Sequence, residues 1–179
     1  VSDDTSEFLS QYHDIPFKGE VPENITPNSP VRNYPYYMNF AGERLLITGG
    51  GHIANRLDRP GTIMTFENNT WNSFQEEGIS EQTKHRYDDI NCIVQDPKDA
   101  THHFAASAGE GIYEFKDGKF INWYSMHNSP LESAVPNEPW ADSYVRVNGL
   151  IYDKENNLWM VSCETQHAVS VLMKNGDWA

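Results

Sequence analysis

Six consecutive residues, Gly-Gly-Gly-His-Ile-Ala at positions 49–54, match the G-x-G-x-x-A spacing of a dinucleotide-binding turn. That chemistry needs a helix to begin at the last glycine, so that the amides of the helix N-terminus meet a pyrophosphate. Residues 55–61 instead hold two arginines and a proline, and they show no apolar periodicity. The sequence therefore predicts a glycine-rich loop between two strands, and no cofactor site.

The same loop is locally basic in an otherwise acidic chain, because it carries His52, Arg56 and Arg59. Guanidinium groups on an exposed loop suit the recognition of phosphate or carboxylate. The alternative interpretation is a solvated loop whose arginines pair with local acids such as Asp58. We take His52, Arg56 and Arg59 as one part of a candidate ligand or partner surface.

A second long connection, residues 126–143, places Trp140 among three prolines. Long loops in a compact β domain carry function more often than short ones do. Trp140 therefore completes the set of candidate binding residues.

Other residues of catalytic or metal-binding type have spacings that do not form a site. His102 and His103 are adjacent, so on a strand they point to opposite faces and cannot share a metal. Residues 153–157 alternate oxygen-bearing side chains but lack the glycine and terminal Glu of a calcium loop, which favours a turn capped by Asp153. The chain has no G-x-S-x-G motif, and no carboxylate pair stands out. We predict no catalytic residues, no metal and no cofactor.

The elements that must position these loops are short strands that recur three times. Asp117-Gly118 and Asn175-Gly176 lie between apolar residues, as hairpin turns do, and Asn68-Asn69 fills the same place in the first copy. Four short strands at a period of roughly 50 residues are typical of propeller blades. We predict an all-β fold, a β-propeller fragment of about three four-stranded antiparallel blades at residues 36–75, 88–125 and 145–179.

The two ends of the chain do not fit this repeat. Residues 1–35 are rich in proline, which predicts an irregular connection, with a short helix over residues 6–13. Residues 176–179 stop inside an expected fourth strand, so we expect the blades to be cut from a larger propeller. Three blades cannot close a ring alone, which predicts an open arc, completion by further sequence, or self-association through open blade edges.

Composition narrows the classes of function. The chain has 179 residues, 38% of them hydrophobic, and carries 26 acidic against 13 basic residues, a net charge of −13. That charge argues against nucleic acid, which needs a basic stripe to displace phosphate counterions. No apolar run approaches the roughly 20 residues of a membrane span. Two cysteines are too few for a disulfide framework, so Cys92 and Cys163 are predicted to be buried free thiols.

Two copies of the repeat resemble a known family. Residues 147–162 are similar to the two-component-regulator propeller repeat, with a strand, an Asp, a polar turn and then a Leu-Trp strand. Residues 96–120, followed by Asn-Ser-Pro-Leu at 128–131, resemble one branch more closely, the PorZ-like propellers of the type IX secretion system of Bacteroidetes. Residues 45–51 and Arg-Pro-Gly-Thr at 59–62 share that likeness. The first copy departs from the repeat, since it lacks the Asp and the Leu-Trp strand.

The resemblance implies a non-enzymatic, periplasmic or cell-surface scaffold. The family works with a sortase-like protease that attaches secreted cargo to anionic lipopolysaccharide, so the implied partner is a protein or an anionic polysaccharide or other glycan. No catalytic residues carry over. The alternative is the periplasmic ligand-sensing propeller of a hybrid two-component regulator, and a propeller lyase or glycosidase is a third class.

Overall fold

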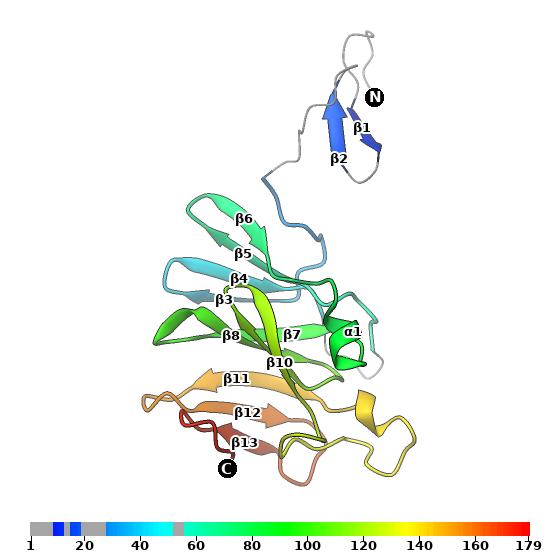
Figure 1. The fold of residues 1–179 in the computed structure, drawn as a ribbon, viewed down its shortest axis with the longest axis vertical. Coiled ribbons are helices and arrows are strands. Elements are labelled where there is room, and N and C mark those ends of the chain that lie inside the picture. The colour runs from blue at the N-terminus through cyan, green and yellow to red at the C-terminus, as the bar shows by residue number, and fades with distance from the viewer. Residues whose placement is uncertain (1–8, 13–14, 19–27, 52–55) are drawn as a thin grey trace.

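The structure is a computed structural model that describes residues 9–12, 15–18, 28–51 and 56–179 (Figure 1). Its first elements are β1 (Leu9–Tyr12) and β2 (Ile15–Lys18), which pair as an antiparallel hairpin. The helix predicted over residues 6–13 is therefore wrong where the structure describes this segment. A helix of two turns is marginal without packing, whereas all four residues of β1 find a partner in β2.

Three antiparallel sheets follow, and we call them blades 1, 2 and 3. Blade 1 contains β3 (Tyr37–Ala41), β4 (Arg44–Thr48), β5 (Ile63–Glu67) and β6 (Thr70–Ser73). Blade 2 contains β7 (Ile90–Asp96), β8 (Asp99–Ser107), β9 (Ile112–Lys116) and β10 (Lys119–Tyr124). Blade 3 contains β11 (Val147–Tyr152), β12 (Leu158–Ser162) and β13 (Val169–Leu172). The predicted all-β fold of about three blades is confirmed.

Blade 3 has only the beginning of a fourth strand. Leu172 forms an isolated bridge with Trp178, and the backbones of Val171 and Ala179 exchange two hydrogen bonds. The turn that precedes this pairing contains Gly176, whose φ is +90°. The chain thus reaches the fourth-strand position in all three sheets.

The hairpin turns follow the predicted chemistry. In blade 1, Asn68 and Asn69 both have positive φ, and in blade 2 Asp117 and Gly118 do as well. Two consecutive residues with positive φ match the right-handed twist of the flanking strands. Asp153 caps its turn as predicted, because its Oδ1 accepts the backbone N–H of Asn157 at 2.8 Å.

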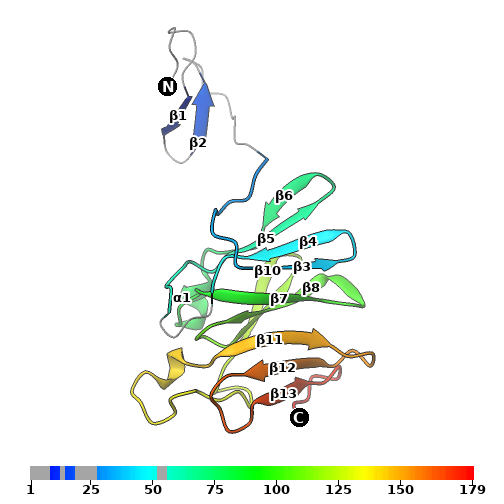
Figure 2. The ribbon, with the colours of Figure 1, turned by 180° about the vertical axis from the view of Figure 1, so that it is seen from behind.

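Blade 2 lies between blades 1 and 3 along the molecule (Figures 1 and 2), and each pair of neighbours shares a core. Leu46 and Ile63 of blade 1 pack in one cluster with Ile93, Tyr113 and Phe115 of blade 2. A second cluster joins the other face of blade 2 to blade 3. In blade 2, the alternation of side chains along the strands sends residues of opposite faces into these two different cores.

The connections gather at one end of the blades. Helix α1 (Ile79–Thr83) lies between blades 1 and 2, and the 3-10 helix η1 (Ala141–Ser143) lies between blades 2 and 3. Both lie at the same end of the strands as the described residues of the 49–61 loop, 49–51 and 56–61 (Figure 1). The sequence did not predict either helix. No helix in the described part of the chain has the length and apolarity that a membrane crossing requires.

The two cysteines are free, as predicted. Cys92 is buried between blades 2 and 3, and burial raises the pKa of its thiol to about 12. Cys163 is half-buried rather than buried, because it lies in the connection after β12.

Candidate functional site

Arg56 is the centre of a buried ion-pair cluster at the loop-bearing end of the blades. Its Nη1 donates to Glu110 Oε1 at 2.8 Å and to the carbonyl oxygen of Ser143 at 3.1 Å, and its Nη2 donates to Asp88 Oδ1. Burial would lower the pKa of Arg56, but the hydrogen bond to Glu110 and the charge of Asp88 raise it above its ordinary value. Arg56 therefore stays charged and ties the 49–61 loop to blade 2 and to the next connection.

Arg86 extends this cluster to the surface. Its Nη2 lies 2.7 Å from Asp88 Oδ2 and 2.6 Å from Asp58 Oδ1. Burial raises the pKa of Asp88, and the two guanidinium groups act in the opposite direction. The side chain of Arg86 is about half exposed, so the outer part of the cluster is open to solvent while the Arg56 part is not.

Asp89 fixes the backbone of the loop that carries Arg56. Its carboxylate accepts the backbone N–H groups of Leu57, Asp58 and Arg59 at 3.0, 3.0 and 3.1 Å. Three such bonds hold this part of the loop in one conformation although it has no regular structure. The segment directly before β7 of blade 2 thus positions a loop that belongs to blade 1.

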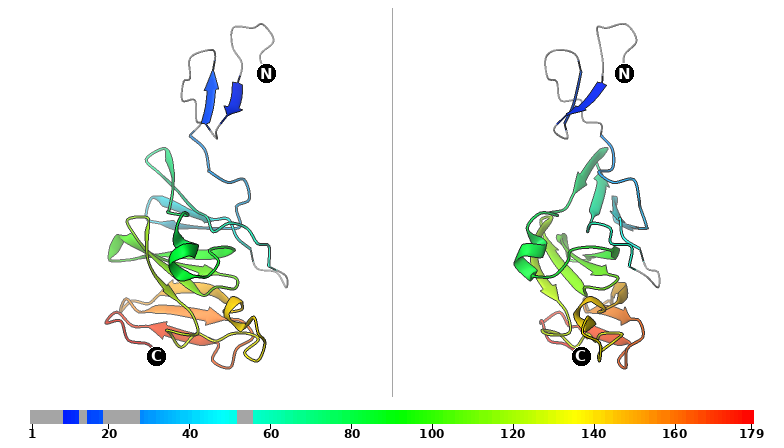
Figure 3. Two further views of the ribbon diagram at one scale, coloured as in Figure 1. Left: turned by 45° about the vertical axis from the view of Figure 1, so that its right-hand side comes forward. Right: turned by 90° about the vertical axis from the view of Figure 1, so that its right-hand side faces the viewer.

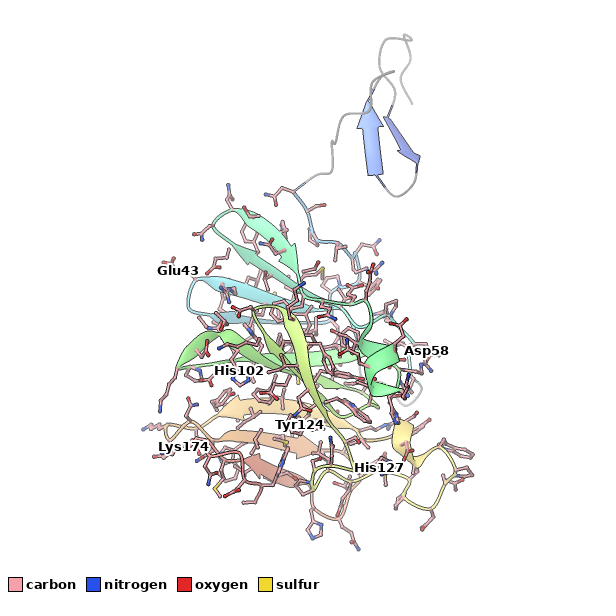
Figure 4. All side chains as sticks on the ribbon, in the orientation of Figure 1. Glu43, Asp58, His102, Tyr124, His127 and Lys174 are labelled. Atoms are coloured by element: carbon pink, nitrogen blue, oxygen red, sulfur yellow. The ribbon has the colours of Figure 1, made fainter. Side chains whose placement is uncertain are left out.

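A cavity of about 740 Å³ opens beside the cluster, and we call it the Trp140 cavity. It joins three segments that are distant in sequence, because its walls come from the 49–61 loop, from residues 80–88 and from residues 139–143. Figure 4 shows Asp58, which comes from the first of these segments, beside helix α1. The titratable side chains in its wall are Asp58, Lys84, His85, Arg86, Tyr87, Asp88 and Asp142.

Trp140 contributes an exposed aromatic ring to the wall of this cavity. It precedes η1 and is 54% exposed, which is unusual for so large an apolar side chain. His85 on the opposite segment packs its ring on Trp123, with 4.4 Å between the ring centroids, and its Nδ1 lies 3.4 Å from Glu110 Oε2. The volume lies in the range of small-molecule sites, although the depression is wide open to solvent, and its wall combines an exposed aromatic ring with several charged side chains.

The structure brings only part of the predicted binding set to this cavity. Trp140 lines it, whereas Arg56 lies beneath it in the buried cluster. Arg59 turns away, with its guanidinium 5.2 Å from the ring centre of Tyr34 and donating to the carbonyl oxygen of Gly50 at 3.2 Å. His52 lies outside the described residues. The role of these four residues in binding stays a prediction.

Sequence reasoning missed the segment 84–88, which supplies most of the charged wall. Its Lys-His-Arg-Tyr-Asp run stands directly before the first strand of the second copy, a position the repeat comparison treated as a linker. The mixture of basic and acidic residues in this run could have identified it as a candidate part of the site. The pairing of Asp88 with Arg56, 32 residues away, was not visible in the sequence.

Three carboxylates in this region approach one another without forming an open cation site. Oxygens of Asp58, Asp88 and Asp89 lie within 4.8 Å of one another. Arg56 and Arg86 compensate Asp88, Arg86 pairs with Asp58, and backbone amides occupy Asp89. These acids therefore form the ion-pair cluster, in the case of Asp58 and Asp88, and hold the loop, in the case of Asp89.

The adjacent histidines point to opposite faces of β8, as predicted. His102 Nε2 lies 2.6 Å from Glu114 Oε1 on the side of blade 3, near Tyr124 (Figure 4). His103 is buried on the other side, edge-on to Phe74 of the preceding segment. Burial lowers the pKa of His103 to about 4. The two rings cannot act on one ligand.

Comparison with known proteins gives a likeness of fold. The chain aligns with a solved structure of PorZ, described as an essential bacterial surface component of the type IX secretion system of human oral-microbiomic Porphyromonas gingivalis. The TM-score is 0.77 and the identity 24%, over 92% of this chain. The chain spans only 21% of the length of that protein. No family model and no curated protein matches the sequence.

That likeness extends over all three blades, and so it supports the propeller-type fold of this chain. At this level of identity it establishes nothing about what the Trp140 cavity binds.

Proposed function

We propose that this chain is part of a non-enzymatic recognition scaffold of the bacterial cell envelope, linked to type IX secretion. The observation that carries the proposal is the alignment of 92% of the chain with PorZ at a TM-score of 0.77. PorZ is described as a surface component of that system. The proposed location is accordingly the cell surface or the periplasm.

Within this scaffold, we assign recognition to the Trp140 cavity. Its rigid floor is the buried Arg56 cluster, and its rim offers an exposed indole together with the cations Lys84 and Arg86. An exposed aromatic ring beside a lysine suits a glycan that carries acid groups. Arg86 is already paired with Asp58 and Asp88, so Lys84 is the cation that we assign to such a ligand.

The test is direct binding of the purified chain to anionic lipopolysaccharide, with neutral dextran as the comparison ligand, by isothermal titration calorimetry. We expect Trp140→Ala and Lys84→Ala each to weaken binding about tenfold, since each removes about 1.4 kcal/mol of contact energy. Lys154→Ala is the matched control, because this exposed lysine lies in the turn before β12, away from the cavity. Unaltered affinity in both cavity variants would reject the cavity as the recognition site.

A protein partner is the other outcome of this test. If neither lipopolysaccharide nor dextran binds, the glycan assignment fails while the scaffold proposal stands on the fold. A pull-down from envelope extract that loses the same protein in Trp140→Ala and keeps it in Lys154→Ala would then identify a protein ligand of the cavity.

A further inference from the structure

Blades 1 and 2 enclose a second depression, at the end of the strands opposite the Trp140 cavity. Its volume is about 360 Å³, and we call it the His103 groove. Its rim lies at the hairpin turns, since it includes Arg44 at the start of β4, Glu67 at the end of β5 and the Asp117–Gly118 turn. Figure 3 shows these two blades side by side, with blade 3 beyond blade 2. Both blades have four strands, so the groove lies between complete neighbours.

The register of blade 1 directs polar side chains into this groove. Leu46 pairs with Thr65, and Thr65 pairs with Asn72, so the three side chains lie on one face of the sheet. Leu46 belongs to the core that blade 1 shares with blade 2, which identifies this face as the one toward the groove. Thr65 and Asn72 both line the groove, and their side chains form no hydrogen bond with the described residues. One wall therefore offers a hydroxyl and an amide that are free to bind a ligand.

His103 lies in the opposite wall and is buried without a partner for its ring. It is 1% exposed, and neither Nδ1 nor Nε2 completes a hydrogen bond with the described residues. Burial lowers the pKa of His103 to about 4, against the opposing influence of the Thr101 backbone, so the ring is neutral. A neutral imidazole has one donor and one acceptor, and leaving either of them unpaired in a protein interior is costly. Buried polar groups of this kind call for an explanation.

The repeat does not require a polar residue at this position. Gln95 pairs with His103 in blade 2, and Tyr152 pairs with Leu158 in blade 3. In both blades this is the fourth pair after the register shift in the first strand, so His103 and Leu158 correspond. Leu158 is 1% exposed and packs in the core toward the preceding blade. Because leucine satisfies the fold at this place, packing alone does not explain the imidazole.

The groove offers hydrogen bonds but no unpaired cation among its described wall residues. Arg44 is occupied, because it pairs with Glu67 at 3.0 Å and donates to the carbonyl oxygen of Ala100 at 2.6 Å. Asp117 is exposed at the rim, and its carboxylate pairs with no described residue. An acid would meet no compensating charge here, and an apolar ligand would leave the polar groups of the wall unpartnered. A neutral ligand with several hydroxyls fits, because each hydroxyl both donates and accepts, as the imidazole does.

From these observations we propose that the His103 groove binds a neutral saccharide, whose hydroxyls pair with His103, Thr65 and Asn72. The carboxylate of Asp117 accepts a further hydroxyl at the rim. The volume lies at the lower end of the range for small-molecule sites, which limits the ligand to a short saccharide. This inference does not rest on the role assigned to the Trp140 cavity, because it concerns other residues, the other end of the blades and an uncharged ligand.

NMR titration of the isotope-labelled full chain with glucose, galactose, mannose and N-acetylglucosamine tests this inference. We expect at least one of these sugars to shift the backbone amide signals of residues 65, 72, 101–103 and 117. Cyclohexanol, a six-membered ring with one hydroxyl, and glucuronate, which adds a carboxylate, should each bind about tenfold more weakly. His103→Leu and Thr65→Val should each weaken binding of the sugar about tenfold. Thr165→Val is the matched control, because Thr165 bonds within its own loop and does not line the groove.

The remaining outcomes overturn the inference. No shift with any of the four sugars would show that the groove is not a saccharide site, and shifts confined to the Trp140 cavity would place the sugar there instead. Glucuronate that binds as tightly as the neutral sugars would contradict an uncharged ligand. Unaltered affinity in both groove variants would remove His103 and Thr65 from the site. Circular dichroism checks that the variants keep the fold, and Thr65→Val decides the matter alone if His103→Leu does not fold.

Discussion

Arg56 shows how a residue with the chemistry of ligand recognition can serve the interior of a protein. Its guanidinium forms ion pairs with two buried carboxylates, Asp88 and Glu110, and little of it reaches solvent. Removing one partner of a buried ion pair leaves uncompensated charge, at a cost of about 3–5 kcal/mol. We expect Arg56→Met to lower the free energy of unfolding by this amount in urea denaturation.

Arg59→Met is the matched control for Arg56→Met, because the Arg59 guanidinium donates to a backbone carbonyl and lies over the ring of Tyr34, and it pairs with no carboxylate among the described residues. It should change stability by less than about 1 kcal/mol. Equal effects of the two substitutions would contradict the assignment of Arg56 to a buried structural cluster.

His103 makes the stability of the fold depend on pH. Burial lowers its folded pKa to about 4 from the ordinary 6.5, so the unfolded chain takes up a proton at a higher pH than the folded chain does. Stability therefore falls as the pH drops from about 6.5 to about 4, by about 3 kcal/mol in total. Leu158 occupies the corresponding position in blade 3, so we expect His103→Leu to fold.

Urea denaturation of the wild type and His103→Leu at pH 7, 5.5 and 4.5 measures this effect. The difference in unfolding free energy should shift in favour of the variant as the pH falls. The pKa of Asp153, which is lowered to about 2, affects stability only at more acidic pH and is common to both proteins. A constant difference across this range would exclude His103 as the cause.

At the scale of elements, the glycine run at 49–51 lets blade 1 approach blade 2 closely. Gly50 donates its N–H to the carbonyl oxygen of Ile90 at 2.8 Å, and a Cβ at Gly50 would lie 2.3 Å from that oxygen. Backbone cannot move aside cheaply, so we expect Gly50→Ala to destabilise the chain by about 1–3 kcal/mol in thermal or urea unfolding. Gly51→Ala should cost less, since the close contact of its Cβ would be with the end of the flexible Leu57 side chain, at 2.4 Å, rather than with backbone. The reverse order would contradict this account of the glycine run.

The sequence predicted the strands and their turns because these depend on local patterns. Period-two alternation and turn residues that tolerate positive φ located the hairpins of blades 1 and 2. Helix α1 has only five residues and no repeating apolar face, so no local sequence pattern predicted it. The strand at residues 9–12 was mistaken for a helix for a related reason, since pairing with β2 decides its conformation.

At the scale of the whole molecule, the candidate site depends on contacts between segments far apart in sequence. The repeat pointed correctly to a propeller fragment. The two loops in which its copies differ stay candidates for binding, and the structure places parts of both around one cavity. It could not show that Arg56 turns inward to Glu110, because that direction is set by the packing of neighbouring blades. The charged segment 84–88 has no counterpart in the other copies of the repeat, so the comparison of copies did not identify it as part of the site.

Hydrogen–deuterium exchange of the wild-type chain with and without anionic lipopolysaccharide tests the central claim most directly, since it maps the contact without substitutions. We expect the ligand to slow exchange in residues 84–88 and 139–143, the two segments that face each other across the Trp140 cavity. Slower exchange confined to blade 3, or none in these two segments while the ligand is bound, would contradict the assignment of recognition to this cavity.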